Sequence, residues 1–144
     1  MAELIRFSEG VALAFHALAR LAQAEGRLSA AGIAAQLGAS PAHVAKVLQV
    51  LVRAKLVTAK RGPHGGYALA RPPEEIRLLE VYEAVEGELR RDGCVFSHPV
   101  CAGQGCLFGD LVEGIRARLR AELSGRTLAE AVGRPPRGDE CPFG

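Results

Sequence analysis

Apolar residues recur at helical spacing in two stretches near the start of the chain. Residues 8–24 predict an amphipathic helix, with Ser8 as its N-cap and Glu9 in its first turn. Residues 28–37 predict a second, shorter helix that is rich in alanine and ends at Gly38. Each helix has an apolar face that must be covered, so the pattern favours a packed helical domain.

A third helix is predicted over residues 40–54, and its polar face is basic. Ser40 is the N-cap, and Pro41 occupies the first helical position, where its missing N–H costs nothing. The apolar residues of this helix form one stripe: Val44, Val47, Leu48 and Leu51. The polar side chains therefore point elsewhere: His43, Lys46, Gln49 and Arg53.

A hairpin and three further segments follow. Short strands are predicted over residues 56–60 and 67–70, because turn residues rich in glycine separate them. A helix is predicted over residues 76–85, and an irregular segment with glycine and proline over residues 92–109. A longer helix is predicted over residues 107–123, and a short helix begins with a capping box at Thr127. The longer helix is predicted to carry its large apolar residues on one side: Leu107, Leu111, Val112, Ile115, Leu119 and Leu123.

The order of helix, glycine turn, proline-capped helix and hairpin is that of a winged helix-turn-helix. We therefore predict a mainly α protein, with a two-stranded wing and a long C-terminal dimerisation helix. The apolar side of the 107–123 helix is expected to pair with its copy in a homodimer. Packing of this side within a single chain is the alternative.

Charge divides the chain into a basic and an acidic half. Residues 1–72 carry nine Lys/Arg against three Asp/Glu, a net +6, whereas residues 73–144 carry nine against thirteen, a net −4. A basic half that contains a helix-turn-helix favours double-stranded DNA as the partner. Base contacts are expected near the start of the third helix, from Ser40, His43 and Lys46. Phosphate contacts are expected from Arg53, Lys55, Lys60, Arg61 and His64. A protein-interaction winged domain with ordinary solvated charges is the alternative.

Three cysteines, Cys94, Cys101 and Cys106, lie in one segment of thirteen residues that also contains glycines. Thiolates bind iron–sulfur clusters and zinc, and glycines let the backbone approach the sulfur atoms closely. Three ligands leave one coordination position to a weaker ligand, which suits a sensor. An iron–sulfur cluster is the first hypothesis. Zinc held by the same cysteines and His98 is the second, and thiols without a metal are the third.

Five residues are candidates for the fourth ligand: Glu9, His16, His98, Asp110 and Cys141. Each also has an ordinary explanation. An acidic residue in the first turn is favoured by the helix dipole alone, and His16 on a mostly apolar helix is explained equally well as a core residue. The spacing of these residues does not rank them.

The chain has no segment that predicts secretion, membrane insertion or catalysis. Its N-terminus lacks the basic and apolar regions of a signal peptide, so a cytoplasmic protein is expected. In a reducing compartment, four cysteines favour metal ligands or redox thiols over structural disulfides. A reactive-cysteine enzyme is the rival hypothesis, but no nucleophile signature lies outside the cysteine loop. We therefore expect no enzyme activity.

The order of elements, the wing motif RGPHGGY, the cysteine loop and the terminal TLAEAV resemble the IscR/NsrR/RirA family of bacterial iron–sulfur transcription regulators, the Rrf-two superfamily. The resemblance covers about residues 4–132. It implies a homodimer on a palindromic operator, with a 2Fe–2S or 4Fe–4S cluster held by Cys94, Cys101 and Cys106. It also implies Glu9 of the partner subunit as the fourth ligand, since RFSE places an acidic residue where the nitric-oxide-sensing branch uses one. Gly109 stands where the IscR branch carries a histidine, which favours a nitric-oxide or redox sensor.

These observations together predict a cytoplasmic, homodimeric transcriptional regulator, most simply a repressor, that senses nitric oxide, redox or iron status. Residues 1–72 would form the DNA-binding domain, residues 73–132 the cluster-binding loop and dimerisation helix, and residues 133–144 a flexible tail. A zinc-stabilised winged-helix structural or protein-interaction module is the alternative.

Overall fold

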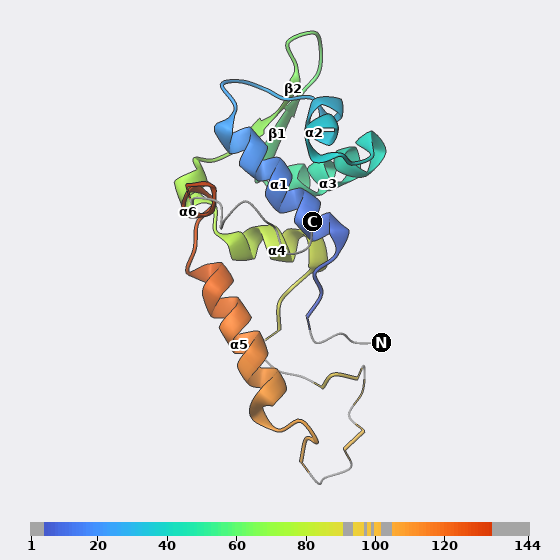
Figure 1. Cartoon of the computed structure of the whole chain (residues 1–144), viewed down its shortest axis with the longest axis vertical. Helices are drawn as coiled ribbons and strands as arrows, with labels where there is room; N and C mark the ends of the chain where they lie inside the picture. Colours follow the sequence, from blue (N-terminus) through green and yellow to red (C-terminus); the bar gives the residue numbers. More distant parts are fainter. Residues whose placement is uncertain (1–4, 91–93, 97, 99, 102–104, 134–144) are drawn as a thin grey trace.

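A computed structural model describes residues 5–90, 94–96, 98, 100–101 and 105–133 (Figure 1). Its elements follow in the order α1 (Glu9–Gln23), α2 (Ala30–Leu37), α3 (Pro41–Arg53), β1 (Val57–Lys60), β2 (Gly66–Leu69), a 3-10 turn η1 (Pro73–Glu75), α4 (Leu78–Glu86), α5 (Asp110–Ser124) and α6 (Leu128–Val132). The predicted winged helix-turn-helix, with its two-stranded wing and long C-terminal helix, is confirmed.

The core lies where α1 crosses α3 and α4 (Figure 1). Leu18 on α1, Ile33 on α2 and Leu48 on α3 are completely buried in it. Ile76 and Leu128 from the C-terminal half of the chain complete the same cluster. The apolar faces predicted for the first three helices are therefore the faces that pack.

Serine side chains start the first three helices. The Ser8 hydroxyl accepts a hydrogen bond from the Val11 N–H at 3.3 Å, and Ser40 accepts one from the His43 N–H at 3.4 Å. The second helix begins at Ala30, two residues later than predicted, because Ser29 is its N-cap. Leu28 instead pairs with β2, through backbone hydrogen bonds of 3.0 and 2.7 Å with Tyr67.

The helices of the C-terminal half are also shorter at their starts than the sequence predicted. Helix α4 begins at Leu78 instead of Ile76, because Ile76 is extended and its carbonyl accepts a hydrogen bond from the Leu128 N–H at 2.8 Å. Helix α5 begins at Asp110 instead of Leu107, because residues 107–109 form a turn that ends with Gly109 at a φ of +52°. The predicted last helix, capped by Thr127, is present as α6.

Helix α5 has two apolar faces instead of the single one predicted. Val112 and Leu123 are buried, and Leu119 packs against the cluster that contains Tyr82 of α4. Leu111 and Ile115 lie on a different side and are 62% and 38% exposed. Figure 1 shows α5 extending away from the winged domain. Among the residues that the structure describes, no helix is long and apolar enough to span a membrane.

Candidate nucleic-acid interface and cysteine loop

The polar face of α3 is open along its whole length. The side chains of Lys46, Gln49 and Arg53 are exposed, while the apolar stripe on the opposite side is buried in the core. His43 is half-buried in the first turn, and the Ser40 hydroxyl is engaged as the N-cap. The predicted base-contacting residues therefore lie together at the start of an accessible helix.

The basic residues predicted to contact phosphates are all exposed: Arg53, Lys55, Lys60, Arg61 and His64. Several other arginines in the described chain have carboxylate partners, such as Arg71 with Glu80 at 2.7 Å and Arg126 with Glu122 at 2.6 Å. No described carboxylate pairs with any of the four cations Arg53, Lys55, Lys60 and Arg61. The surface of α3 and the wing thus carries positive charge that the described residues leave unbalanced.

The position of the wing depends on Arg27, a residue that the sequence analysis missed. Its guanidinium donates to the carbonyl of Gly66 at 3.0 Å, and to the carbonyl and hydroxyl of Thr58, each at 3.3 Å. One side chain from the α1–α2 loop therefore joins both strands of the wing. Nothing in the local sequence marks Arg27, because its partners lie more than thirty residues further along the chain.

Gly66 allows the α1–α2 loop to approach the wing closely. Its φ is +117°, and a Cβ atom built at this position would lie 2.7 Å from the carbonyl oxygen of Leu28. Any side chain here would have to displace backbone. Arg27 and Gly66 together hold the hairpin against the helical domain.

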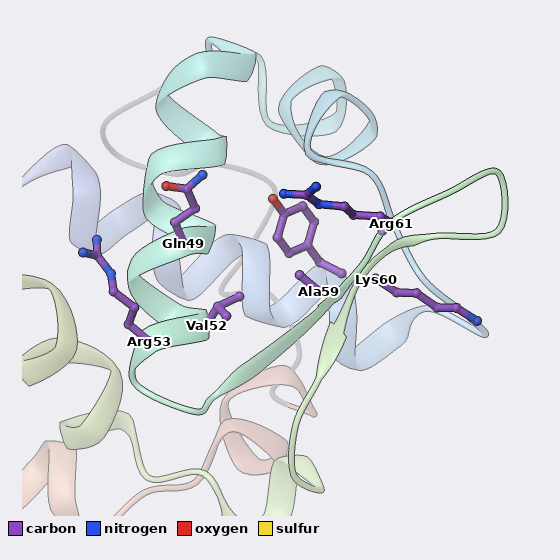
Figure 2. Close-up of a pocket in the computed structure, with 8 residues that line it drawn as sticks. Gln49, Val52, Arg53, Ala59, Lys60 and Arg61 are labelled. Carbon is purple, nitrogen blue, oxygen red and sulfur yellow. The ribbon is translucent and has the colours of Figure 1, made fainter.

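A groove of about 540 Å³ separates α3 from the wing (Figure 2). Its lining residues come from both elements and include no carboxylate: Gln49, Val52, Arg53, Ala59, Lys60, Arg61, Gly66 and Tyr67. Figure 2 shows Arg61 reaching back from the wing toward α3, where Gln49 lies, whereas the end of the Lys60 side chain points away from α3. Sequence reasoning assigned no role to Gln49 or Tyr67, because only the packing of wing on helix brings them together.

A predicted cluster ligand and a predicted base-contacting residue lie close together at the starts of α1 and α3. A carboxylate oxygen of Glu9, the fourth-ligand candidate, lies 4.0 Å from Nδ1 of His43, a predicted base contact. The Glu9 side chain is 76% exposed, so it remains open to a further partner. The N-terminus of α1 thus places the candidate ligand beside the recognition helix.

A nearly buried carboxylate fixes the start of α1. The Glu86 side chain, 7% exposed, accepts a hydrogen bond from the Ser8 hydroxyl and pairs with Nε of Arg6 at 3.5 Å. Phe7 packs against the ring of Tyr82 with ring centroids 5.5 Å apart. Since Glu86 and Tyr82 belong to α4, the residues preceding Glu9 are held by the helix that leads into the cysteine loop.

The cysteine loop begins at a second anchored point. Arg120 of α5 donates to Oε1 of Glu83 at 3.1 Å and to the carbonyl of Leu89 at 2.7 Å. The Leu89 N–H donates to the same carboxylate oxygen at 3.1 Å. This network ties α4, α5 and the chain just before Cys94 together.

Cys94 and Cys101 are half-buried, Cys106 is exposed, and none of the three is in a disulfide. Three free thiols on one loop are a donor set that suits an iron–sulfur cluster or zinc. Within the described ranges, however, no three metal-ligating side chains are gathered into one group. The donor chemistry therefore fits a metal cofactor, while the described atoms do not assemble its coordination shell.

The other fourth-ligand candidates that the structure describes lie on different segments of the chain. His16 is exposed and its Nδ1 lies 2.7 Å from the Ala12 carbonyl oxygen, so its interpretation as a core residue is wrong. His98 and Asp110 are exposed, and Asp110 lies in the first turn of α5. Cys141 lies outside the described residues. Glu9 lies within 4.0 Å of His43 on the recognition helix.

Known proteins share both this sequence and this fold. Residues 7–134 match the Rrf2 family, described as iron-dependent transcriptional regulators. The HTH-type transcriptional regulator IscR of Cereibacter sphaeroides is 36% identical over 106 residues, which cover 72% of this chain and 65% of that protein. IscR of Aliivibrio salmonicida is 31% identical over 108 residues, covering 75% of this chain and 64% of that protein. The chain thus spans slightly less than two thirds of the length of these relatives.

Solved structures show the same architecture. T. potens IscR superposes with a TM-score of 0.69 at 27% identity, covering 93% of this chain and 94% of that one. CymR, the global cysteine regulator of B. subtilis, has a TM-score of 0.76 at 23% identity, covers 92% of this chain and 99% of that one, and supports the fold alone. These relatives are transcriptional regulators, which agrees with the expectation that the chain is not an enzyme. The chain belongs to the Rrf2 family of helix-turn-helix transcriptional regulators.

Proposed function

We propose that this protein is a cytoplasmic, homodimeric transcriptional repressor that binds a palindromic DNA operator. The main support is the cationic surface of α3 and the wing. On this surface, no described carboxylate pairs with Arg53, Lys55, Lys60 or Arg61. A polyanion supplies the missing negative charge along an extended surface, and DNA is the polyanion that a helix-turn-helix fits. His43 and Lys46 would contact bases, while the wing would contact the backbone.

The second apolar face of α5 supports the homodimer. Leu111 and Ile115 of α5 are exposed by 62% and 38%, and Leu107 and Phe108 in the turn before the helix are also exposed. Large exposed apolar side chains on a helix and on the turn before it are unfavourable in water and favour a partner surface. A second copy of α5 offers the same surface in a two-fold arrangement, which matches the symmetry of a palindromic operator.

Cys94, Cys101 and Cys106 would hold an iron–sulfur cluster, and Glu9 of the partner subunit would complete it. When bound, such a cluster supplies a centre that reacts with nitric oxide and with oxidants and depends on the iron supply. Within the chain, a Glu9 carboxylate oxygen lies 4.0 Å from Nδ1 of His43. A change in the surroundings of this carboxylate would therefore be felt at the start of the recognition helix. The match to a family of iron-dependent regulators supports this assignment of the cysteines.

Anaerobic purification followed by metal analysis and DNA titration tests this function. We expect iron, sulfide and visible absorption in the wild-type protein, and tight binding to a palindromic duplex that weakens as salt is raised. Substituting Ser for Cys101 should remove the visible absorption and the response of DNA binding to nitric oxide. Glu9→Ala should leave a cluster with an altered spectrum or greater lability.

Each part of the proposal has its own contradicting result. Stoichiometric zinc without iron would contradict the cluster and favour the zinc-stabilised module. An unchanged spectrum in Cys101→Ser would exclude Cys101 as a ligand. Absence of any salt-dependent binding to genomic fragments would contradict the DNA-binding function itself.

A further inference from the structure

The groove between α3 and the wing contains hydrogen-bond donors for which the described residues provide no partner. The Gln49 amide and the Arg61 guanidinium face the same space from opposite walls (Figure 2). The Tyr67 side chain also lines this space. Among the described residues, none of these three side chains has a hydrogen bond or ion pair within the chain. The groove therefore offers two neutral donors and the Arg61 guanidinium to an outside acceptor, and Arg53 and Lys60 also line it.

Part of the remaining wall of the groove is apolar. Val52 of α3 and Ala59 of β1 contribute aliphatic surface, and the ring of Tyr67 contributes aromatic surface. A purely ionic site would not need these walls. An occupant that combines an anionic group with a small uncharged carbon skeleton fits the lining better.

The backbone of a DNA duplex supplies an anionic group attached to a small uncharged carbon skeleton. When a recognition helix lies in the major groove and its wing reaches the adjacent minor groove, one sugar–phosphate strand separates the two. That strand has to cross the space between helix and wing. In this chain that space is the groove of Gln49, Arg61 and Tyr67.

We propose that this groove binds one deoxyribose-phosphate unit of the operator backbone. Gln49 and Tyr67 donate neutral hydrogen bonds to the phosphate with which Arg61 pairs, and Val52 and Ala59 contact the sugar. The inference rests on the proposed DNA-binding function and adds two contacts to it. It distinguishes Arg61, whose side chain points toward α3, from Lys60, whose side chain points the other way (Figure 2). Lys60 would therefore reach a neighbouring stretch of the DNA backbone.

Neutral donors and cations differ in their response to salt. A cation that pairs with a phosphate releases counterions, so its removal flattens the dependence of affinity on salt. A hydroxyl or amide releases none. Loss of the Gln49 and Tyr67 contacts should therefore lower affinity at every salt concentration by a similar factor, equally for all sequences.

The test combines two variants with duplexes that carry one methylphosphonate each. Tyr67→Phe removes only the hydroxyl, Gln49→Ala removes the amide, and Gln36→Ala is the matched control on exposed α2 surface outside the groove. Circular dichroism and thermal unfolding first establish that each variant is folded. Affinity is then measured by fluorescence anisotropy at several chloride concentrations, with the neutral methylphosphonate moved along both strands.

Each groove variant is expected to lose roughly tenfold in affinity for the unmodified duplex, the order of one hydrogen bond to a charged group, while Gln36→Ala loses none. The slope against salt should stay that of the wild type. At one phosphate per half-site, neutralisation should weaken the wild type strongly and the groove variants much less, because the same contact is already lost.

Three results would overturn the inference. The first is that, at every position of the methylphosphonate, the loss of affinity it causes adds fully to the loss caused by the groove substitution. The second is an affinity of Tyr67→Phe equal to that of the wild type, a result that does not depend on whether Gln49→Ala folds. The third is competition by inorganic phosphate at matched ionic strength, which would assign the groove to a free oxyanion. In each case the wild-type protein still binds DNA, whereas failure of the proposed function would leave no binding to any duplex.

Discussion

Replacing Arg27 by alanine should loosen the wing without unfolding the domain. The guanidinium makes three hydrogen bonds to the hairpin, to the Gly66 carbonyl at 3.0 Å and to the carbonyl and hydroxyl of Thr58 at 3.3 Å. Two of the three are long and exposed, and water can replace them in the variant. We therefore expect the wing to lose about 1–2 kcal/mol of local stability, less than three ideal hydrogen bonds would give.

The backbone pairing of Leu28 with Tyr67, which remains in the variant, determines where the loss of local stability is observed. Leu28 and Tyr67 still exchange backbone hydrogen bonds of 3.0 and 2.7 Å, so the strands should stay formed but open more often. A loss of about 1–2 kcal/mol corresponds to a roughly five- to thirtyfold decrease in protection from hydrogen exchange. This decrease should appear in the amides of β1 and β2 and leave those of α1 unchanged.

Arg20→Ala is the control for the lost charge. Arg20 is exposed near the end of α1, and no described side chain pairs with it. Hydrogen exchange followed by NMR or mass spectrometry, together with DNA titration of both variants, separates the two effects. Equal protection of the wing in Arg27→Ala and Arg20→Ala would refute the positioning role, and so would a wing that is destabilised but binds DNA with wild-type affinity.

Three further predictions follow from the charges and the apolar face. Arg61→Ala should weaken binding to all sequences alike and reduce the salt slope by about one counterion, whereas Lys46→Ala should alter sequence preference; competition with random duplex distinguishes them. Leu111→Arg should yield folded monomers in sedimentation, since an unpaired charge in an apolar interface costs several kcal/mol, about 3–5 for a buried ion; an unchanged dimer would place the interface elsewhere. Glu80 should contribute to acid unfolding. Burial raises its pKa, but hydrogen bonds from the Arg77 N–H and the Arg71 guanidinium outweigh this and lower it below the ordinary value. The stability from Glu80 is therefore present above the ordinary pKa and lost as pH falls through the lowered pKa. Glu80→Gln should flatten the dependence of the free energy of unfolding on pH over this range.

The sequence predicted those features that neighbouring residues determine. Ser8 and Ser40 cap helices because each hydroxyl binds an N–H three residues away, and the α3 stripe is buried because its spacing leaves one continuous face. The boundaries that were wrong depend on distant partners. Leu28 and Ile76 pair with Tyr67 and Leu128, and these pairings keep both residues out of the following helix.

The features of the candidate site also fall into those that neighbouring residues determine and those that depend on distant partners. The exposed cations of α3 and the wing follow from helical periodicity and turn residues, so the sequence located them. Helical periodicity could not divide the apolar residues of α5 into a buried and an exposed face, because α4 decides which residues are covered. The contacts of Arg27 with the wing and of Glu9 with His43 likewise exist only after distant segments have packed together.

The contact between Glu9 and His43 limits how this regulator can be redesigned. A new operator preference obtained by replacing His43 would also change the surroundings of the carboxylate that we assign to the sensor, so the response threshold would shift together with the target sequence. Lys46 lies one turn further along α3, and no described carboxylate pairs with it. Engineering of specificity should therefore begin at Lys46, while variation at His43 suits a search for altered sensitivity.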